Sequence, residues 1–203
     1  MELIVLTRSA KNEGLCVAGL DANNEQFVRL VTNDEKTHYA VPRSKMNGIN
    51  TLDVIDVPII GYNPSFCQKE NYIADVSKPW YIVGHIDIHD LIPRIDNNSY
   101  QWLFGNQSCY LLEEEAQKMT YSLTLIKVND LNLETNTYGK TKAHFEYNGK
   151  RYTNMAVTDW DYFGLEGKFS EALIVVSIPD IGKESQYYEG KRCYKLVSRI
   201  FTL

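Results

Sequence analysis

The sequence predicts a mainly β protein, built from two small antiparallel β-barrels that are joined by a short helical segment. β-rich runs stand on both sides of one helical stretch, and each half supplies about five strands in roughly 85 residues. Helices do not alternate with strands, which disfavours a parallel α/β sheet. Short strands that must hide their edges favour closed barrels. The expected parts are a first barrel over residues 1–95, a helical connector over 96–120 and a second barrel over 121–203.

In the first half, five runs are rich in residues that favour strands. The run "DVIDVPII" contains Pro58, which has no N–H to donate to a neighbouring strand and therefore suits an edge strand or a bulge. The expected strands are Glu2–Thr7, Leu15–Leu20, Phe27–Thr32, Asp53–Ile60 and Tyr81–Ile88.

The connector changes this pattern. "LIPRIDNNSYQWLFG" and "CYLLEEEAQKM" show the helical spacing of apolar residues, and Gly105 separates them. Glu113, Glu114 and Glu115 then form a solvated helix face.

Strand signals resume in the second half. Asn148-Gly149 lies between two β-rich runs and predicts a hairpin with a type I′ turn, because that turn needs positive φ at both central residues. The expected strands are Ser122–Glu134, Lys140–Gly149, Lys150–Asp159, Glu171–Asp180 and Cys193–Leu203.

Five short strands most often close as an OB-fold, in which a helix commonly lies between the third and fourth strands. Residues Asp161–Ser170 occupy that position in the second half. A sandwich and an SH3-like barrel stay open as alternatives.

Charge limits the possible partners of the 203-residue chain, whose formal net charge is −5. Up to Thr120 there are 10 Lys and Arg against 16 Asp and Glu, and after it 11 against 10. This balance argues against a strong non-specific grip on phosphate, so a nucleic-acid site would need a local basic patch, best placed in the second half.

Four dispersed cysteines, Cys16, Cys67, Cys109 and Cys193, have no C-x₂-C spacing and suggest reduced thiols in a cytoplasmic protein. "MELIVLTRSAK" lacks the charged leader of a signal peptide. No apolar run approaches about 18 residues, so no membrane span is expected.

The order of several runs resembles a known family. "NEGLCVAGLD" followed by "FVRLVT", then "LDVIDVPI", "CQKENYIAD" and Trp80, is similar to the first half of bacterial dual OB-containing domain proteins. "YSLTLIKV", "AVTDW" and "CYKLVSRIF" resemble their second half. The resemblance implies two tandem OB barrels, association with nucleic acid and a setting of bacterial defence against phage. No established catalytic activity comes with the resemblance.

Basic and aromatic residues in the first half form one candidate surface. Arg29 shares a strand face with Phe27 and Val31, where its guanidinium can pair with phosphate or stack on a base. The alternative is a structural ion pair with Asp21, Glu25, Asp34 or Glu35. The candidate residues of this half are Arg8, Lys11, Arg29, Arg43, Lys45 and Trp80.

In the second half, "KTKAHFEYNGKRY" interleaves cations with rings, as single-stranded nucleic acid requires, although any amphipathic hairpin looks similar. "GKRCYKLVSR" adds cations on the last strand. The candidate residues here are Lys142, Lys150, Arg151, Tyr152, Lys195 and Arg199.

Catalysis has little support, and neither a catalytic residue nor a cofactor is predicted. His85, Asp87 and His89 have strand spacing on one face and could bind a metal, but such a set is more often a polar edge. Asp159 and Asp161 in "TDWDYF" suit a turn, with Asp159 accepting from nearby backbone N–H groups.

The favoured function is therefore a non-catalytic module that binds single-stranded nucleic acid. The alternative is a protein-interaction module, an accessory subunit of a larger complex, because the acidic total and the many tyrosines suit that equally. A metal-dependent hydrolase is the least favoured class.

Overall fold

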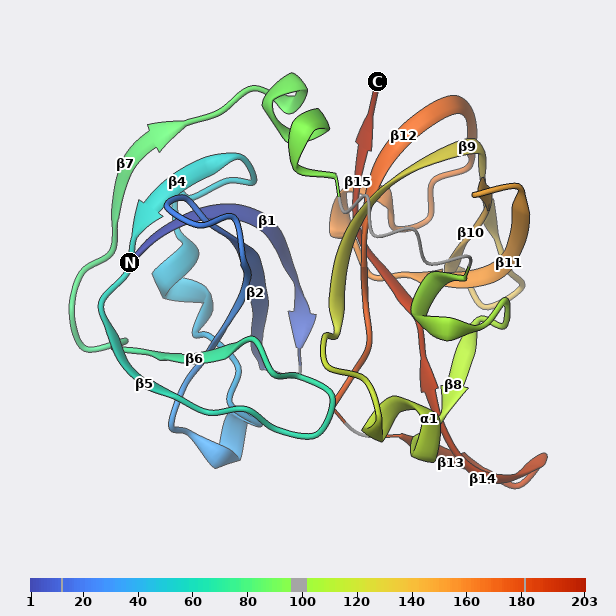
Figure 1. Ribbon diagram of the computed structural model, residues 1–203, viewed down its shortest axis with the longest axis horizontal. Coiled ribbons are helices and arrows are strands. Elements are labelled where there is room, and N and C mark those ends of the chain that lie inside the picture. Colours follow the sequence, from blue (N-terminus) through green and yellow to red (C-terminus); the bar gives the residue numbers. More distant parts are fainter. Residues whose placement is uncertain (12, 96–101, 181) are drawn as a thin grey trace. The chain divides into compact units, whose positions relative to one another are not determined.

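The computed structural model describes residues 1–11, 13–95, 102–180 and 182–203 (Figure 1). It divides into two compact units. Unit 1 is Met1–Pro64 with Glu70–Arg94, and unit 2 is Ser65–Lys69 with Ile95–Leu203. The expected boundaries at residues 95 and 120 stay a prediction. Mainly β architecture with two OB-like barrels and a small helical linker is confirmed.

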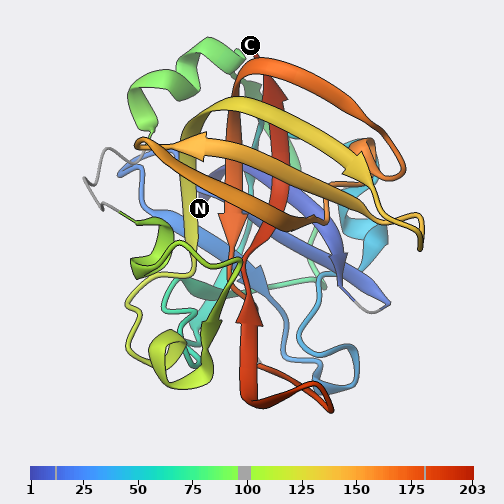
Figure 2. The same cartoon turned by 90° about the vertical axis from the view of Figure 1, so that its right-hand side faces the viewer.

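Unit 2 contains a closed five-stranded barrel (Figure 2). Its strands follow the ring order β10-β11-β15-β12-β9, in which only β11 and β15 run parallel. This is the order of a five-stranded Greek-key barrel of OB type. The strands are β9 (Leu123–Thr135), β10 (Thr141–Tyr147), β11 (Lys150–Val157), β12 (Gly167–Ser177) and β15 (Leu196–Thr202).

The predicted hairpin joins β10 to β11. Tyr147 pairs with Lys150, and the two residues between them have φ values of 50° at Asn148 and 68° at Gly149. Positive φ at both positions is the type I′ requirement, so the hairpin is confirmed.

Unit 1 repeats this strand order with one strand broken. The expected single strand Asp53–Ile60 is two strands, β4 and β5, separated by Val57 and Pro58. β4 pairs with β1, and β5 pairs with β6, which runs parallel to β3. Val57 and Pro58 therefore link the two ends of an open hydrogen-bonded order, β5-β6-β3-β2-β1-β4-β7, and Pro58 has no N–H to donate. The strands are β1 (Glu2–Lys11), β2 (Gly14–Asp21), β3 (Phe27–Val31), β4 (Asp53–Asp56), β5 (Ile59–Tyr62), β6 (Asn71–Ala74) and β7 (Tyr81–His85).

The connector is less helical than its apolar spacing predicts. The helix expected on "CYLLEEEAQKM" is reduced to α1 (Glu113–Gln117), because the preceding residues form β8 (Tyr110–Leu112) and pair with β14. The first predicted helical stretch lies partly outside the described residues. The remaining elements are η1 (Glu35–Thr37), η2 (Arg43–Met46), η3 (Ile88–Arg94), η4 (Leu103–Gly105), η5 (Trp160–Tyr162), β13 (Lys183–Ser185) and β14 (Tyr188–Tyr194).

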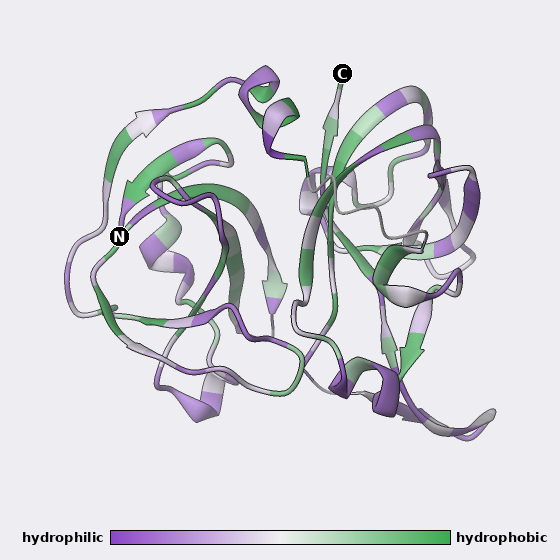
Figure 3. Cartoon of the chain, viewed as in Figure 1, coloured by the Kyte–Doolittle hydropathy of each residue, from purple (hydrophilic) through white to green (hydrophobic). Residues whose placement is uncertain are grey.

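Each unit has its own apolar core. Leu3, Val5 and Val28 lie in the core of unit 1, and Ile126 and Phe145 in that of unit 2. Figure 3 shows hydrophobic colour along much of β1 and hydrophilic colour on α1. No helix within the described residues is both long and apolar enough to cross a membrane.

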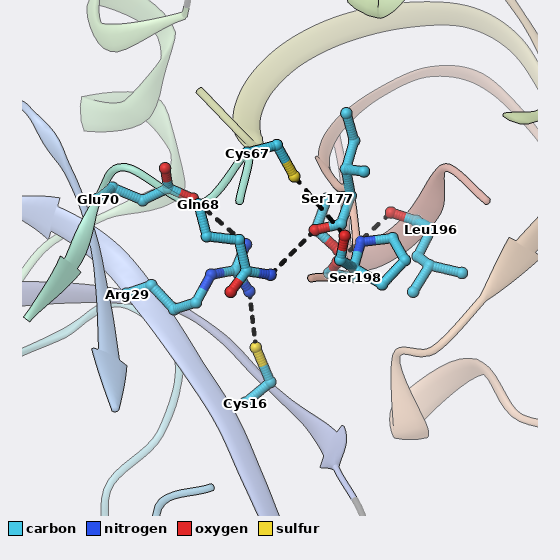
Figure 4. A network of polar contacts seen from close by, with 10 residues as sticks. Cys16, Arg29, Cys67, Gln68, Glu70, Ser177, Leu196 and Ser198 are labelled. Carbon is cyan, nitrogen blue, oxygen red and sulfur yellow. Dashed lines mark hydrogen bonds and ion pairs between the residues drawn. The ribbon is translucent and has the colours of Figure 1, made fainter. Parts of the chain in front are cut away.

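The segment Ser65–Lys69 belongs to unit 2, although β5 and β6 on either side of it belong to unit 1. Cys67 is fully buried in the unit 2 core, and the Gln68 Nε2 donates to the Ile178 carbonyl oxygen at 3.1 Å (Figure 4). The segment is thus part of the packed structure of unit 2.

Candidate nucleic-acid interface

Arg29, the most conspicuous candidate in unit 1, is buried in a polar cluster. Its Nη1 donates to the Cys16 Sγ at 2.9 Å, and its Nη2 lies 3.4 Å from the Glu70 Oε1 (Figure 4). Burial alone would lower the pKa of Arg29, but the neighbouring Cys16 and Glu70 outweigh it, so the pKa is raised. An ion pair was the expected alternative role, but the partner is Glu70 rather than an acid of the hairpin or of Asp34–Glu35.

Two other cations of unit 1 hold backbone carbonyls. The Arg8 Nη1 donates to the Ile49 oxygen at 2.7 Å, and the Lys45 Nζ donates to the Lys78 oxygen at 2.7 Å. Both side chains therefore stabilise loops of unit 1 through hydrogen bonds to the backbone.

The remaining candidates of unit 1 are dispersed over different elements. Lys11 ends β1, Arg43 is exposed in η2, and the half-buried Trp80 donates from its Nε1 to the Asp75 oxygen at 3.2 Å. None of the six candidates of unit 1 lines the pocket described below.

Two candidates of unit 2, Tyr152 and Lys195, are fully buried. The Tyr152 hydroxyl accepts from the Leu103 N–H at 2.7 Å and donates to the Asn106 carbonyl at 3.4 Å. The Lys195 Nζ donates to the Leu103 oxygen at 2.6 Å, to the Asn106 carbonyl at 2.7 Å and to the Asn106 Oδ1 at 2.8 Å. Burial raises the pKa of Tyr152 and lowers that of Lys195 to about 7. Both side chains point into the interior of unit 2, where they bind Leu103 and Asn106.

Arg199 is paired with acids. Its Nη1 lies 3.2 Å from the Asp159 Oδ1 and also contacts the Asp161 carboxylate. Asp159 in turn accepts from the Asp161 N–H at 3.2 Å and from the Ile200 N–H at 2.9 Å. Burial raises the pKa of Asp159, and Arg199 partly opposes that shift. The predicted structural role of Asp159 in a turn is confirmed.

A pocket of about 420 Å³ lies on three strands of unit 2. Asp130, with φ 47°, sits at an irregularity in the pairing of β9 with β10, and its carbonyl accepts from the Arg151 Nη1 at 3.4 Å. Such a bulge re-aims side chains next to binding sites. The lining residues are Asp130, Leu131 and Asn132 of β9, Arg151 of β11, and Lys168, Phe169 and Ser170 of β12.

An aromatic residue of the connector adjoins the same strand. The Lys150 Nζ lies 4.9 Å from the centre of the Trp102 ring, within the range of a cation–π contact. The Gln107 Nε2 donates to the Arg151 carbonyl at 2.9 Å. Lys142 is half-buried on the adjacent strand β10, opposite Ala156 of β11.

This arrangement has the chemistry of an anion site with a ring beside it. Among the described residues, neither Arg151 nor Lys168 forms an ion pair with an acid. Their charges are therefore available to phosphate, while Phe169 in the pocket and Trp102 beside Lys150 have ring surface on which a base could stack.

The residues considered as a metal site, His85, Asp87 and His89, make other contacts in the structure. The His85 Nδ1 lies 2.9 Å from the Asp53 Oδ1, and Asp87 accepts from the His89 N–H at 2.9 Å. Over the described ranges, no group of three or more His, Cys, Asp or Glu residues could hold a metal ion. Asp87 therefore has a local role at the start of η3.

Sequence reasoning missed Lys168, Phe169 and Trp102. The strand containing the first two was expected to begin at Glu171, whereas β12 begins at Gly167. Alternation in "GKFS", with two polar residues around Phe169, was the available signal. Trp102 was read as part of a helix, and its position beside Lys150 depends on the fold.

Comparison with protein families shows that the family model of the dual OB-containing domain matches residues 1–200. Neither the curated proteins nor the solved structures give a match.

Proposed function

Because the chain belongs to the family of dual OB-containing domain proteins, a family of binding modules, we propose that it binds single-stranded nucleic acid through unit 2. The binding surface in this proposal, called the β11–β12 surface, consists of Trp102, Lys150, Arg151, Lys168 and Phe169. The observation that carries the proposal is the pocket in which Arg151 and Lys168 stand without acidic partners beside Phe169.

The volume and composition of the pocket support a ligand that is part anion and part ring. About 420 Å³ is within the usual range of small-molecule and nucleotide sites. Phosphate would pair with Arg151, whose planar guanidinium suits two oxygens of one group. A base would stack on Phe169 or Trp102, and stacking on aromatic side chains is typically worth about 1–3 kcal/mol per base.

The formal net charge of −5 favours a single strand over a duplex. A duplex binder needs a broad basic surface against a dense row of phosphates, whereas a single strand also exposes its bases for stacking. Three cations beside two rings fit the second case.

The proposal is tested by fluorescence anisotropy with labelled single-stranded DNA and RNA between about 50 and 200 mM salt. We expect binding that weakens as salt rises. Replacing Arg151 and Lys168 with Ala should weaken it about tenfold or more and reduce the salt slope by roughly one to two, one phosphate contact for each cation.

The matched control changes the net charge by the same amount elsewhere. Lys36 and Lys118 are exposed and lie outside the pocket, so Lys36→Ala with Lys118→Ala should bind almost as the wild type does. The proposal fails if neither nucleic acid binds at low salt, or if the control pair loses as much affinity as the pocket pair.

One observation supports protein interaction as a second candidate function. β7 is an edge strand in unit 1, and Tyr81, Ile82 and Val83 are more than half exposed. Exposed apolar edges recruit extended segments of partner proteins by strand addition. A partner recovered after nuclease treatment, retained by the Arg151/Lys168 variant and lost by Val83→Lys, would support this function; loss by both variants would count against it.

A further inference from the structure

The segment Trp102–Gln107 is fastened to the barrel of unit 2 by side chains that come from far along the chain. Lys195, between β14 and β15, sends its ammonium group into the interior, where three oxygens of Leu103 and Asn106 accept from it at 2.6–2.8 Å. Tyr152 of β11 binds the same two residues through its hydroxyl. We call these four residues the Lys195 cluster.

The geometry of the cluster fits only the protonated lysine. An ammonium group has three N–H donors, and the structure supplies three oxygen acceptors. A neutral amine has two N–H donors and a lone pair, so one of the three oxygens would lose its donor and face that lone pair. The Lys195 side chain is fully buried and its bond to the Leu103 oxygen is buried, so water cannot readily replace a hydrogen bond lost there, whereas the two Asn106 acceptors are half-buried.

The segment held by Lys195 also contributes to the β11–β12 surface. Trp102 immediately precedes Leu103 and lies against Lys150, and Gln107 immediately follows Asn106 and donates to the Arg151 carbonyl. The proton on Lys195 and the position of the Trp102 ring are therefore linked through residues that are adjacent in sequence.

We propose that Lys195 regulates the nucleic-acid site of unit 2 as a proton-dependent switch: the ammonium form holds Trp102 against Lys150, and loss of the proton releases the Trp102–Gln107 segment. This regulation rests on the proposed function, since it acts on the same surface.

The groups around Lys195 place the switch in an accessible pH range. Burial lowers the pKa of Lys195 to about 7, whereas Cys109 of the connector and Glu115 of α1 raise it. The Tyr152 ring lies 5.7 Å from the Nζ, and the raised pKa of its hydroxyl keeps it neutral over this range. The protein should therefore pass from the held to the released state between about pH 6 and 8.5.

The direct test follows Trp102 without any ligand. The chain has three tryptophans, so Trp80→Phe with Trp160→Phe leaves Trp102 as the reporter. Acrylamide quenching of its fluorescence should rise as pH is raised, with a midpoint near the pKa of Lys195, about 7. In this background, Lys195→Met should give high quenching that does not change with pH.

Two more variants keep the test decisive if Lys195→Met does not fold. Asn106→Ala removes one of the three acceptors and leaves two, which a neutral amine can satisfy, so the midpoint should move to lower pH. His144→Gln is the control at a histidine of unit 2 outside the Lys195 cluster, whose Nε2 lies 3.5 Å from the Glu134 Oε2, and it should leave the midpoint unchanged. A flat profile in the reporter protein, or an unchanged midpoint in Asn106→Ala, would overturn the switch.

Binding measurements separate this inference from the proposed function. If single-stranded DNA and RNA both fail to bind, the proposed function fails and so does the regulatory meaning of the switch, while the fluorescence profile still reports whether Lys195 controls Trp102. If an oligonucleotide binds and Trp102 does not respond to pH, the switch fails alone. Support for both requires an affinity that falls severalfold from pH 6 to pH 8.5 in the wild type and not in Lys195→Met.

Discussion

Unit 1 and unit 2 share a strand order, but each surrounds its buried cation differently. In unit 1, Arg29 is next to a carboxylate, Glu70. In unit 2, Lys195 is surrounded by carbonyl and amide oxygens that carry no net charge. A guanidinium stays protonated at any ordinary pH, whereas a buried ammonium group whose hydrogen-bond acceptors are all uncharged loses its proton more readily. Unit 1 thus contains a buried cation with a permanent charge, and unit 2 contains a buried cation that can lose its proton.

The units also differ in the strand that completes the ring. β12 of unit 2 is continuous and pairs with both β9 and β15. In unit 1 the corresponding strand is interrupted at Val57–Pro58. As a result, β4 pairs with β1, whereas β5 pairs with β6. The pocket follows the continuous strand, since three of its lining residues come from the beginning of β12.

The largest expected effect on stability comes from removing the buried, permanently charged Arg29. Replacing Arg29 with Met leaves Glu70 buried without its cation, which should lower the free energy of unfolding by about 3–5 kcal/mol. Adding Glu70→Leu should restore part of that loss. Urea unfolding of both variants tests this, and a loss below about 1 kcal/mol for Arg29→Met would show that the pair is not a buried ion pair in solution.

Loss of the proton from Lys195 should make the stability of the protein depend on pH. The pKa of Lys195 is about 7 in the folded chain and about 10.4 in an unfolded one, so between these values the unfolded state binds more protons. The free energy of unfolding should therefore rise with pH from about 7 to 10, by about 3 kcal/mol from this group. Urea unfolding across that range should show the rise, and Lys195→Met should abolish it. The same rise in the variant would assign it to another group.

Tyr152→Phe should have a smaller effect, confined to unit 2. Without the hydroxyl, the buried Leu103 N–H loses its acceptor, at a cost of about 1–3 kcal/mol. Tyr138→Phe is a matched control, because Tyr138 is 84% exposed and its loss should change stability by less than about 0.5 kcal/mol. Thermal unfolding compares the two, and equal effects would contradict the buried hydrogen bond.

The smallest expected effect is in the β10–β11 turn. Gly149→Ala should cost about 1 kcal/mol, because φ is 68° there and nothing within 4 Å of the added Cβ contributes a clash. Gly84 of unit 1 has ordinary contact with Val54 and no positive φ, so Gly84→Ala should be neutral or slightly stabilising. If Gly84→Ala destabilises the protein as much as Gly149→Ala does, the positive φ in the turn is not the cause of the loss.

Features that depend on neighbouring residues could be predicted from the sequence, and features that depend on distant ones could not. The Asn148-Gly149 hairpin follows from the needs of a two-residue turn, and the paired strands follow from their composition. The partner of Arg29 is 41 residues away, and the acceptors of Lys195 are 89 and 92 residues away. Composition cannot show that these cations are buried. The Arg151–Lys168 pocket similarly depends on the bulge at Asp130 and on where β12 begins.

Photo-crosslinking of a 4-thiouridine-substituted single-stranded RNA, followed by mass spectrometry of the peptides, locates the ligand directly. The account predicts crosslinks in peptides that contain Trp102 or Phe169, and their loss in the variant that replaces Arg151 and Lys168 with Ala. Crosslinks confined to unit 1, for example to the exposed strand Tyr81–His85, would contradict it.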